Sequence, residues 1–280
     1  MPDHRIADWD NAYANGANIA GSDRWPAAWA EPAQAFRDAL SAQGRARIDI
    51  AYGDRPRNRF DLFLPKAAPR GLVVFIHGGY WRMFTKSDYS YVAETVTSAG
   101  AIAVVIDYAL MPAVRMAAIV DQVRRARQWV QDNIASHGGD PGRLSVSGHS
   151  AGAHLATFLF NEDSTHPPSA ALLLGGLYDL KPLQHSFLEP LIGLTDAEVA
   201  AFSPISKSHS SRTKVRMLVG ERETQPFHLQ ARLFADRLIG QDLSVSMGVL
   251  TARNHMDSVR DLGLRGTIAG DWLHHVVVAA

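Results

Sequence analysis

The pentapeptide Gly148-His149-Ser150-Ala151-Gly152 lies between a short apolar segment, 143–147, and a segment of helical character, 151–161. A serine at such a junction has to turn sharply from strand into helix. Glycines two residues before and two residues after it remove the side chains that would block the turn. The turn leaves the Ser150 hydroxyl exposed above the sheet, with the free N–H groups of a helix N-terminus behind it. The pattern predicts a strand–turn–helix unit that presents a nucleophile, and a tight turn in a nucleotide-binding fold is the alternative.

Strand-like and helix-like segments alternate along most of the chain, which predicts an α/β fold. The third to fifth candidate strands are almost wholly apolar, as expected of parallel strands that are buried on both faces. The first two alternate polar and apolar residues and predict an antiparallel ribbon at one edge of the sheet. The candidate strands are 47–52, 59–64, 72–77, 102–108, 143–147, 170–175, 215–220 and 244–249, and the candidate helices are 87–99, 114–137, 151–161, 226–239 and 267–277. About eight mostly parallel strands flanked by helices is the α/β-hydrolase layout.

The length of 280 residues suits one domain, 1–280, with a substantial core. Residues 1–44 are expected to form an N-terminal arm with helical character, in which the clearest helix begins at Trp25-Pro26. Segment 178–212 is the longest without a candidate strand. It falls where hydrolases of this layout insert a cap over the pocket, so we expect a short cap there.

Composition excludes several classes of function. Lys plus Arg and Asp plus Glu both number 28, so no charge excess marks a nucleic-acid or anionic-membrane partner. No apolar run approaches the ~20 residues of a membrane span. Cysteine is absent, which excludes disulfides, thiol catalysis and cysteine-based zinc sites. The N-terminus lacks the apolar segment of a secretory signal, and a cytoplasmic location is therefore the default expectation.

Neither a metal nor a cofactor is expected. His77, His149 and His154 are expected on a loop, an elbow and a helix, without carboxylate spacing or an HExxH pattern. The expected partner is a small-molecule substrate, and a homodimer is left open.

A serine hydroxyl needs a base and an acid that orients the base. In this fold the base follows the last strand, and His255 is the one histidine between that strand and the C-terminal helix. The acid follows the preceding strand, at the exit of which Glu221 and Glu223 compete. The acid commonly lies about three residues past the strand-ending Gly220, which favours Glu223, and Glu221 is the candidate for a solvated turn residue.

Donors for an oxyanion are expected from two places. One is the N–H of Ala151, next to the nucleophile, and the other is the loop His77-Gly78-Gly79-Tyr80-Trp81 after the third strand. In that loop the N–H groups of Gly79 and Tyr80 are best placed to donate. For the side chains of Tyr80 and Trp81 two interpretations stay open: an aromatic pocket wall that binds substrate, or packing under the rim.

The chain resembles the kynurenine formamidase (arylformamidase) group of α/β-hydrolases and the related bacterial esterases. The sequence at 77–81 matches the HGGxW signature of that group. Glu223 stands where an aspartate is common. The other matching segments are Asp61-Leu62-Phe63-Leu64-Pro65, Gly139-Asp140-Pro141, Gly148 to Leu155, Tyr178-Asp179-Leu180, Ser203-Pro204 and Asn254-His255.

The resemblance implies a serine hydrolase that cleaves a small-acyl amide or ester through an acyl-enzyme. An N-formyl arylamine such as N-formylkynurenine, a compound of tryptophan catabolism, is the implied substrate. A weakly basic arylamine leaves readily once His255 has protonated it, so a triad of the esterase type suffices. A short-chain carboxylesterase of the same fold is the alternative, and a non-catalytic binding protein of this fold is a third reading.

Overall fold

An eight-stranded sheet forms the centre of the computed structural model, which describes residues 6, 8–16, 19 and 24–278. The strand order is β1-β2-β4-β3-β5-β6-β7-β8; β3 to β8 run parallel, and β2 is antiparallel to both β1 and β4. The predicted edge ribbon and parallel centre are therefore confirmed. The strands are β1 Ala46–Ala51, β2 Arg59–Phe63, β3 Leu72–Ile76, β4 Ile102–Ile106, β5 Leu144–His149, β6 Ala170–Leu174, β7 Lys214–Gly220 and β8 Val245–Leu250.

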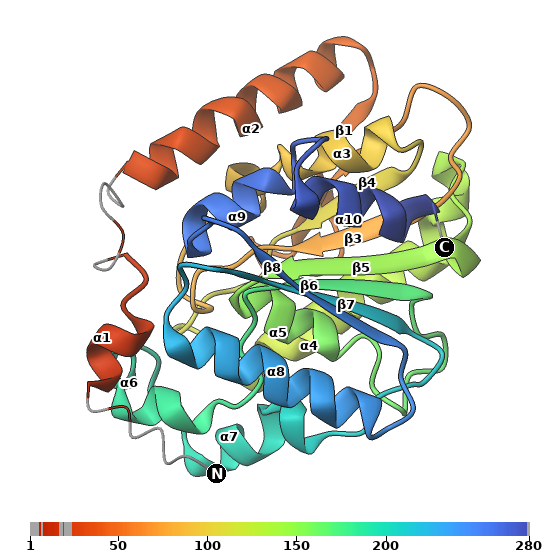
Figure 1. Cartoon of the computed structure of the whole chain (residues 1–280). Helices are drawn as coiled ribbons and strands as arrows, with labels where there is room; N and C mark the ends of the chain where they lie inside the picture. The colour runs from red at the N-terminus through yellow and green to blue at the C-terminus, as the bar shows by residue number, and fades with distance from the viewer. Residues whose placement is uncertain (1–5, 7, 17–18, 20–23, 279–280) are drawn as a thin grey trace.

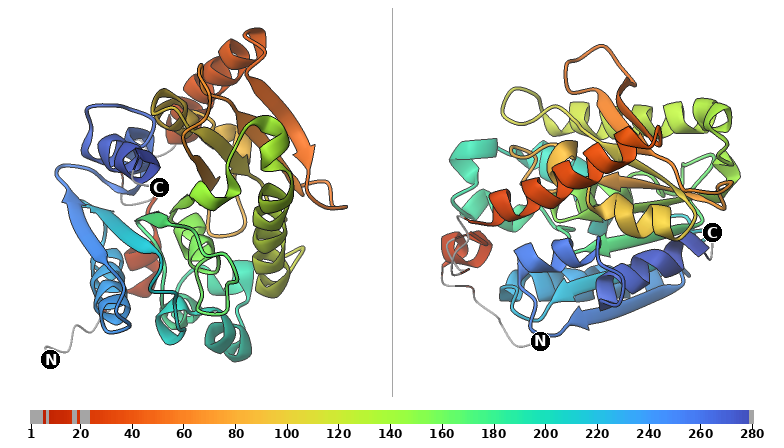
Figure 2. Two further views of the ribbon diagram at one scale, coloured as in Figure 1. Left: turned by 90° about the vertical axis from the view of Figure 1, so that its right-hand side faces the viewer. Right: turned by 90° about the horizontal axis from the view of Figure 1, so that it is seen from above.

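Helices cover both faces of the sheet (Figure 1). On one face lie α3, α9 and α10, with α2 beyond them, and on the other lie α4, α5 and α8. Figure 2 shows the twisted sheet between these layers, with β8 at one edge and β1 near the other. The helices are α1 Trp9–Tyr13, α2 Trp25–Ala42, α3 Val92–Ser98, α4 Met116–Asn133, α5 Ala151–Thr157, α6 Glu189–Ile192, α7 Asp196–Phe202, α8 Gln225–Ile239, α9 His255–Asp261 and α10 Ile268–Val278.

The core divides into two hydrophobic clusters, one on each face of the sheet. All residues of β3, β4 and β5 are buried, which explains the continuous apolar character of β3 and β4. No helix in the described part of the chain combines the length and the hydropathy that a bilayer-spanning segment needs.

Buried ion pairs fix the N-terminal helix α2 to the sheet. The side chain of Asp61 on β2 is fully buried and forms ion pairs with Arg37 of α2 and with Lys86, the latter at 2.8 Å. Asp61 also accepts the backbone N–H of Asp49 at 2.9 Å. Lys86 begins a short 3-10 turn, η2 Lys86–Tyr89, so one carboxylate joins β2, α2 and η2. A buried carboxylate with several donors holds its neighbours in fixed positions because leaving any of them unpaired is costly.

Segment 178–212 contains no strand, as expected, and forms the short helices α6 and α7 with two 3-10 turns. Thr195 and Glu198 form a capping box at the start of α7, and Glu198 also pairs with Arg115 at the start of α4. These contacts attach the segment to α4, on the α5 and α8 side of the sheet (Figure 1).

The start of α5 lies against the end of β3 so closely that only glycine fits at position 152. A Cβ atom on Gly152 would lie 2.0 Å from the carbonyl oxygen of Ile76 and 2.6 Å from that of His77. Gly152→Ala is therefore expected to lower the free energy of unfolding by about 3 kcal/mol or more, measured by urea denaturation.

Gly240→Ala is the matched control for this substitution. Its Cβ would make ordinary contacts at 3.4 and 3.6 Å, and its φ of −66° suits alanine. We expect a change within about 0.5 kcal/mol for the control. A Gly152→Ala variant as stable as the control would contradict the close approach.

Candidate active site

Ser150 occupies the turn between β5 and α5 with φ 56° and ψ −120°. A positive φ is rare for a residue other than glycine and stores strain that the surroundings must hold. The N–H of Ser150 donates to the Leu174 carbonyl at 2.8 Å, and its own carbonyl accepts the N–H of His154 at 3.1 Å. A Cβ on Gly148 would lie 2.3 Å from the Gly152 carbonyl oxygen. The predicted strand–turn–helix unit and the need for both flanking glycines are confirmed.

His255 and Glu223 form a buried pair next to this turn. His255 Nδ1 lies 2.6 Å from Glu223 Oε2, and the other carboxylate oxygen accepts the N–H of Gly220 at 2.8 Å. The two side chains are 5% and 0% exposed, so water does not compete for the contact. A carboxylate oxygen can only accept from Nδ1–H, which leaves Nε2 of the neutral ring with a free lone pair.

The structure brings Glu223, and not Glu221, to the histidine. Glu221 is exposed, and its carboxylate accepts the N–H of Ala252 at 2.6 Å within the neighbouring turn. Gly175 at the end of β6 makes room for the pair, a contribution that sequence reasoning missed. With φ +54°, it would bring a Cβ within 3.0 Å of His255 Nδ1 and 3.1 Å of both Glu223 oxygens.

His255 is the first residue of helix α9, although the sequence predicts a loop there. The side chain of Asn254 accepts the N–H groups of Met256 and Asp257, and Asp257 in return accepts the N–H of Asn254. This capping box fixes the start of the helix and therefore the position of His255. The spacing of Asn254 and Asp257 was the sequence signal for it.

His149, the residue before Ser150, also holds His255 in place. Its Nε2 donates to the His255 carbonyl at 3.0 Å, and the two ring centroids are 4.5 Å apart. Burial, and secondarily the neighbouring His255, lowers the pKa of His149 well below its ordinary value. His149 is therefore a neutral ring at pH 7. No group of three His, Asp or Glu side chains in the described chain has the arrangement of a metal site.

The loop after β3 carries the backbone groups predicted to face an oxyanion. The backbone angle φ is positive at four residues of this loop: Gly79 (109°), Tyr80 (49°), Trp81 (59°) and Phe84 (69°). Within the loop, the Gly79 carbonyl accepts the N–H groups of Arg82 and Met83, each at 3.0 Å. Within the described residues, no acceptor pairs with the N–H of Gly79, Tyr80 or Ala151. Unpaired backbone N–H groups of this kind can donate to a developing oxyanion.

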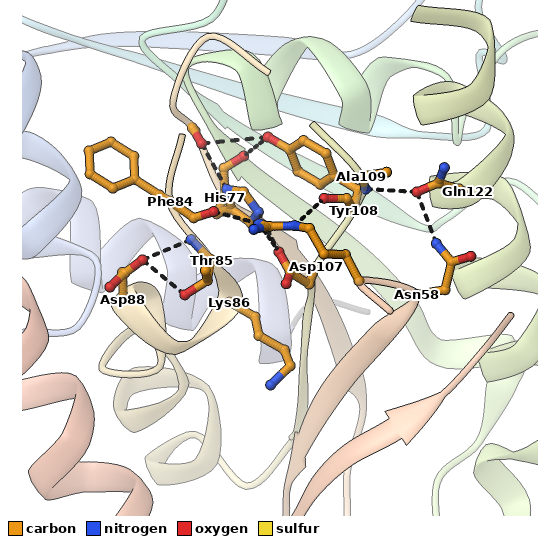
Figure 3. A network of polar contacts seen from close by, with 12 residues as sticks. Asn58, His77, Phe84, Thr85, Lys86, Asp88, Asp107, Tyr108, Ala109 and Gln122 are labelled. Atoms are coloured by element: carbon orange, nitrogen blue, oxygen red, sulfur yellow. Dashed lines mark hydrogen bonds and ion pairs between the residues drawn. The ribbon is translucent and has the colours of Figure 1, made fainter. Parts of the chain in front are cut away.

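A polar network around Asp107 holds this strained loop at both ends (Figure 3). His77 at the loop's start lies with Nε2 3.1 Å from Asp107 Oδ1. Arg57 donates to the same oxygen at 2.6 Å and to the carbonyl of Phe84, at the loop's end, at 2.5 Å. Tyr108 donates its hydroxyl to the His77 carbonyl at 2.9 Å and stacks on that imidazole with centroids 4.3 Å apart. Sequence reasoning did not identify Arg57, Asp107 or Tyr108 as supports of the loop.

A cavity of about 260 Å³ opens beside Ser150 and His255, and its surface is mainly apolar. We expected segment 178–212 to cover the pocket, but no residue of that segment lines the cavity. Asn15 and Trp29 of the N-terminal arm line it instead. The lining residues of the described chain are Asn15, Gly16, Trp29, Gly79, Tyr80, Met83, Phe84, Tyr89, His149, Ser150, His255 and Met256.

Tyr80 and Trp81 have different roles in the structure. Tyr80 lines the cavity, and its hydroxyl donates to the Tyr13 carbonyl at 2.7 Å. Trp81 is fully buried outside the cavity and donates Nε1–H to His154 Nδ1 at 3.2 Å. Burial lowers the pKa of His154 to about 4, so at pH 7 the ring is neutral and Nδ1 can accept. Of the two interpretations left open for Trp81, the structure therefore agrees with packing and not with a contact to substrate.

Comparisons with known proteins agree with this architecture. A family model described as the alpha/beta hydrolase fold matches residues 73–256. A solved structure of a candidate thioesterase from Silicibacter superposes with a TM-score of 0.82 at 31% identity, covering 96% of this chain and 98% of that one. The predicted fold class is confirmed.

Curated relatives include kynurenine formamidases and esterases. Kynurenine formamidase of Danio rerio is 27% identical over 227 residues, covering 77% of this chain and 76% of the relative. Kynurenine formamidase of Drosophila melanogaster is 24% identical, covering 84% and 79%. Esterase LipQ of Mycobacterium tuberculosis is 31% identical over 222 residues, covering 68% and 52%. The resemblance stated from the motifs is confirmed.

Substituting each of the two glutamates after β7 tests which one is the acid partner of His255. Glu223→Gln replaces the carboxylate that accepts from His255 Nδ1, and we expect kcat/KM for p-nitrophenyl acetate to fall by about 10²-fold or more because the ring loses its orienting charge. Glu221→Gln is the matched control, and we expect a change within about twofold because Glu221 is exposed and contacts only a turn. A larger loss in Glu221→Gln than in Glu223→Gln would reassign the acid.

Proposed function

The chain belongs to the alpha/beta hydrolase fold family, and from this premise we propose that it is a serine hydrolase that removes a small acyl group, preferentially formyl, from an arylamine. One observation carries the proposal: His255, which is in buried contact with Glu223 at 2.6 Å, and the strained Ser150 line the same cavity. Burying a carboxylate is costly unless it is paired, and Glu223 is paired with His255 and with the N–H of Gly220. A buried carboxylate–histidine pair at the border of a cavity supports the proposal because such pairs are frequent at functional sites.

In the proposed first step, Ser150 Oγ forms a bond to the formyl carbon while His255 Nε2 takes the hydroxyl proton. The carbonyl oxygen becomes an oxyanion that accepts from the N–H groups of Gly79, Tyr80 and Ala151, for which the structure records no other acceptor in the described chain. The C–N bond then breaks, and the leaving nitrogen receives the proton from His255. The product of this step is a formyl ester on Ser150 and a free arylamine.

In the proposed second step, water attacks the formyl ester. His255 Nε2 takes a proton from the water, the same three N–H groups bind the oxyanion, and the bond between carbon and Ser150 Oγ breaks. The proton returns to Ser150, and formic acid leaves and loses its remaining proton to solvent as formate. Throughout both steps Glu223 stabilises the imidazolium and keeps Nδ1 protonated, as the acid of a triad does.

The aromatic lining of the cavity supports an arylamine as the leaving group. Trp29, Tyr80, Phe84 and Tyr89 give the cavity flat apolar walls, which suit an aromatic ring. The curated relatives named kynurenine formamidase support a formamide, and N-formylkynurenine is accordingly the proposed test substrate.

A carboxylesterase with a short-chain substrate is the second candidate function. Its support is the similarity to LipQ, named an esterase, and to the Silicibacter structure. Both functions use the same nucleophile, base and oxyanion donors, so they differ only in the leaving group. Neither needs a cofactor.

Turnover of a formamide and of a generic ester separates the two functions. We expect kcat/KM for N-formylkynurenine to exceed that for p-nitrophenyl acetate by about tenfold or more, although the ester is the intrinsically more reactive compound. Ser150→Ala is the control and should abolish both activities while the protein stays folded. A formamide that is turned over no better than the ester would favour the esterase.

A further inference from the structure

The side chain of Trp81 anchors the loop after β3 to the interior of the protein. Trp81 directly follows Tyr80, whose N–H is one of the proposed oxyanion donors, and its φ of 59° is strained. Its indole Nε1–H donates to His154 Nδ1 at 3.2 Å, and the two rings meet edge to face with centroids 4.9 Å apart. Its carbonyl accepts the N–H of Met111 at 2.8 Å. The Asp107 network holds the two ends of this loop, and Trp81 holds its middle.

His154 has one tautomer that satisfies both hydrogen bonds of its ring. Its Nε2 lies 2.8 Å from the carbonyl oxygen of Phe202, which can only accept, so Nε2 carries the proton. Nδ1 of the neutral ring then has the free lone pair that the Trp81 N–H requires. Trp81 and His154 are both 0% exposed, so water does not compete for the bond between them. The ring therefore joins a donor on one side to an acceptor on the other.

His154 also connects this loop to the turn that carries Ser150. It lies in α5, and its backbone N–H donates to the Ser150 carbonyl at 3.1 Å. One residue thus bonds to the main chain of the proposed nucleophile and to the side chain next to a proposed oxyanion donor. His154 is fully buried and does not line the cavity. Any effect of His154 on the reaction therefore acts through the groups that it positions.

Segment 178–212 supplies the acceptor that holds the ring of His154. Phe202 ends α7, and the last carbonyls of a helix have no partner within the helix. The hydroxyl of Ser203, the next residue, accepts the N–H of Leu180 at 3.1 Å, which fixes the end of α7 against the start of the segment. The segment therefore supports the site from behind, although none of its residues lines the cavity.

We propose that His154 is a positioning residue, which holds Trp81 so that the N–H of Tyr80 stays directed at the oxyanion. The inference rests on the proposed function, because it requires an oxyanion formed by attack of Ser150. Without the Nδ1 acceptor, the buried indole N–H is left unpaired and the strained loop can relax. The developing charge then loses part of its stabilisation, which lowers kcat and leaves substrate binding nearly unchanged.

Replacing the carbonyl oxygen of a substrate by sulfur tests this role. p-Nitrophenyl acetate and its thiono analogue differ in the atom that becomes negative, and sulfur is a weak hydrogen-bond acceptor. We expect the ratio of kcat/KM, oxo over thiono, to fall about tenfold in His154→Leu and in Trp81→Phe, with KM for the oxoester changed by less than about threefold. Intrinsic reactivities of the two esters cancel in the comparison between enzymes. The double variant should lose about as much as either single variant, because both substitutions break the same bond.

His154→Gln is the conservative variant, and His209→Leu is the matched control. Glutamine carries an acceptor and a donor on one carbon, as Nδ1 and Nε2 share one carbon, so we expect its ratio to stay within about threefold of wild type. His209 is another buried histidine whose pKa burial lowers to about 4, but its ring packs against Phe160 and Phe234 instead of the loop. Its replacement should leave the ratio unchanged.

Two results would overturn the positioning role and leave the bond as packing. One is a wild-type ratio in both His154→Leu and Trp81→Phe, and the other is an equal loss on both esters. Circular dichroism and urea denaturation check the folding of each variant. Trp81→Phe keeps an aromatic ring and decides alone if His154→Leu does not fold.

The ester pair separates this inference from the proposed function. If wild type turns over the oxoester but no formamide, the preference for formyl fails, and the ratio of oxo to thiono ester still decides on His154. If N-formylkynurenine is turned over and the ratio does not respond, the positioning role fails and the proposed function stands. A wild-type protein without Ser150-dependent turnover of any of these substrates would overturn both.

Discussion

Helix α5 begins against the end of β3 at a distance that only a glycine at position 152 allows, and the geometry of the site depends on this contact. The carbonyl of Ile76 would lie 2.0 Å from any Cβ at that position. Ser150 immediately precedes α5, and His77 immediately follows β3, where the loop with the unpaired N–H groups begins. The close approach therefore sets the serine and the proposed oxyanion donors at a fixed separation. Direct contact between two backbone segments fixes their relative position more rigidly than contacts between loop side chains do.

Buried carboxylates hold the remaining parts of the site. Asp107 joins the two ends of the strained loop through His77 and Arg57, Asp61 joins α2 and η2 to the sheet, and Glu223 holds His255. Each accepts from at least two donors in the structure, as a buried charge must. Because the positive φ values of Tyr80, Trp81 and Phe84 are unfavourable, this loop would relax without the network. The fold thus uses buried charge to keep the loop in one conformation.

Much of this arrangement was predictable from the sequence because it is local. The apolar strands and the turn around Ser150 follow from short patterns, and the proposed order of nucleophile, acid and base follows from the fold that those patterns predict. The structure then brings His255 and Glu223 together. The sequence could not show which residues form the cavity wall, because the contact between Trp29 and residues 83–89 joins distant parts of the chain. It also could not decide between two roles for Trp81, since an aromatic residue after Gly79 and Tyr80 fits a pocket or a core equally well. Capping boxes at Thr195 and Asn254 were visible in the sequence and would have predicted α7 and α9.

The central claim is that Ser150 is a nucleophile activated by His255 and Glu223. Labelling the native protein with a fluorophosphonate, followed by mass analysis of its peptides, tests this claim most directly, because the reagent bonds to an activated serine without depending on the natural substrate. The account predicts one equivalent of adduct on the peptide that contains Ser150, and none on a folded Ser150→Ala variant. An unlabelled wild-type protein, or an adduct on a different serine, would contradict it.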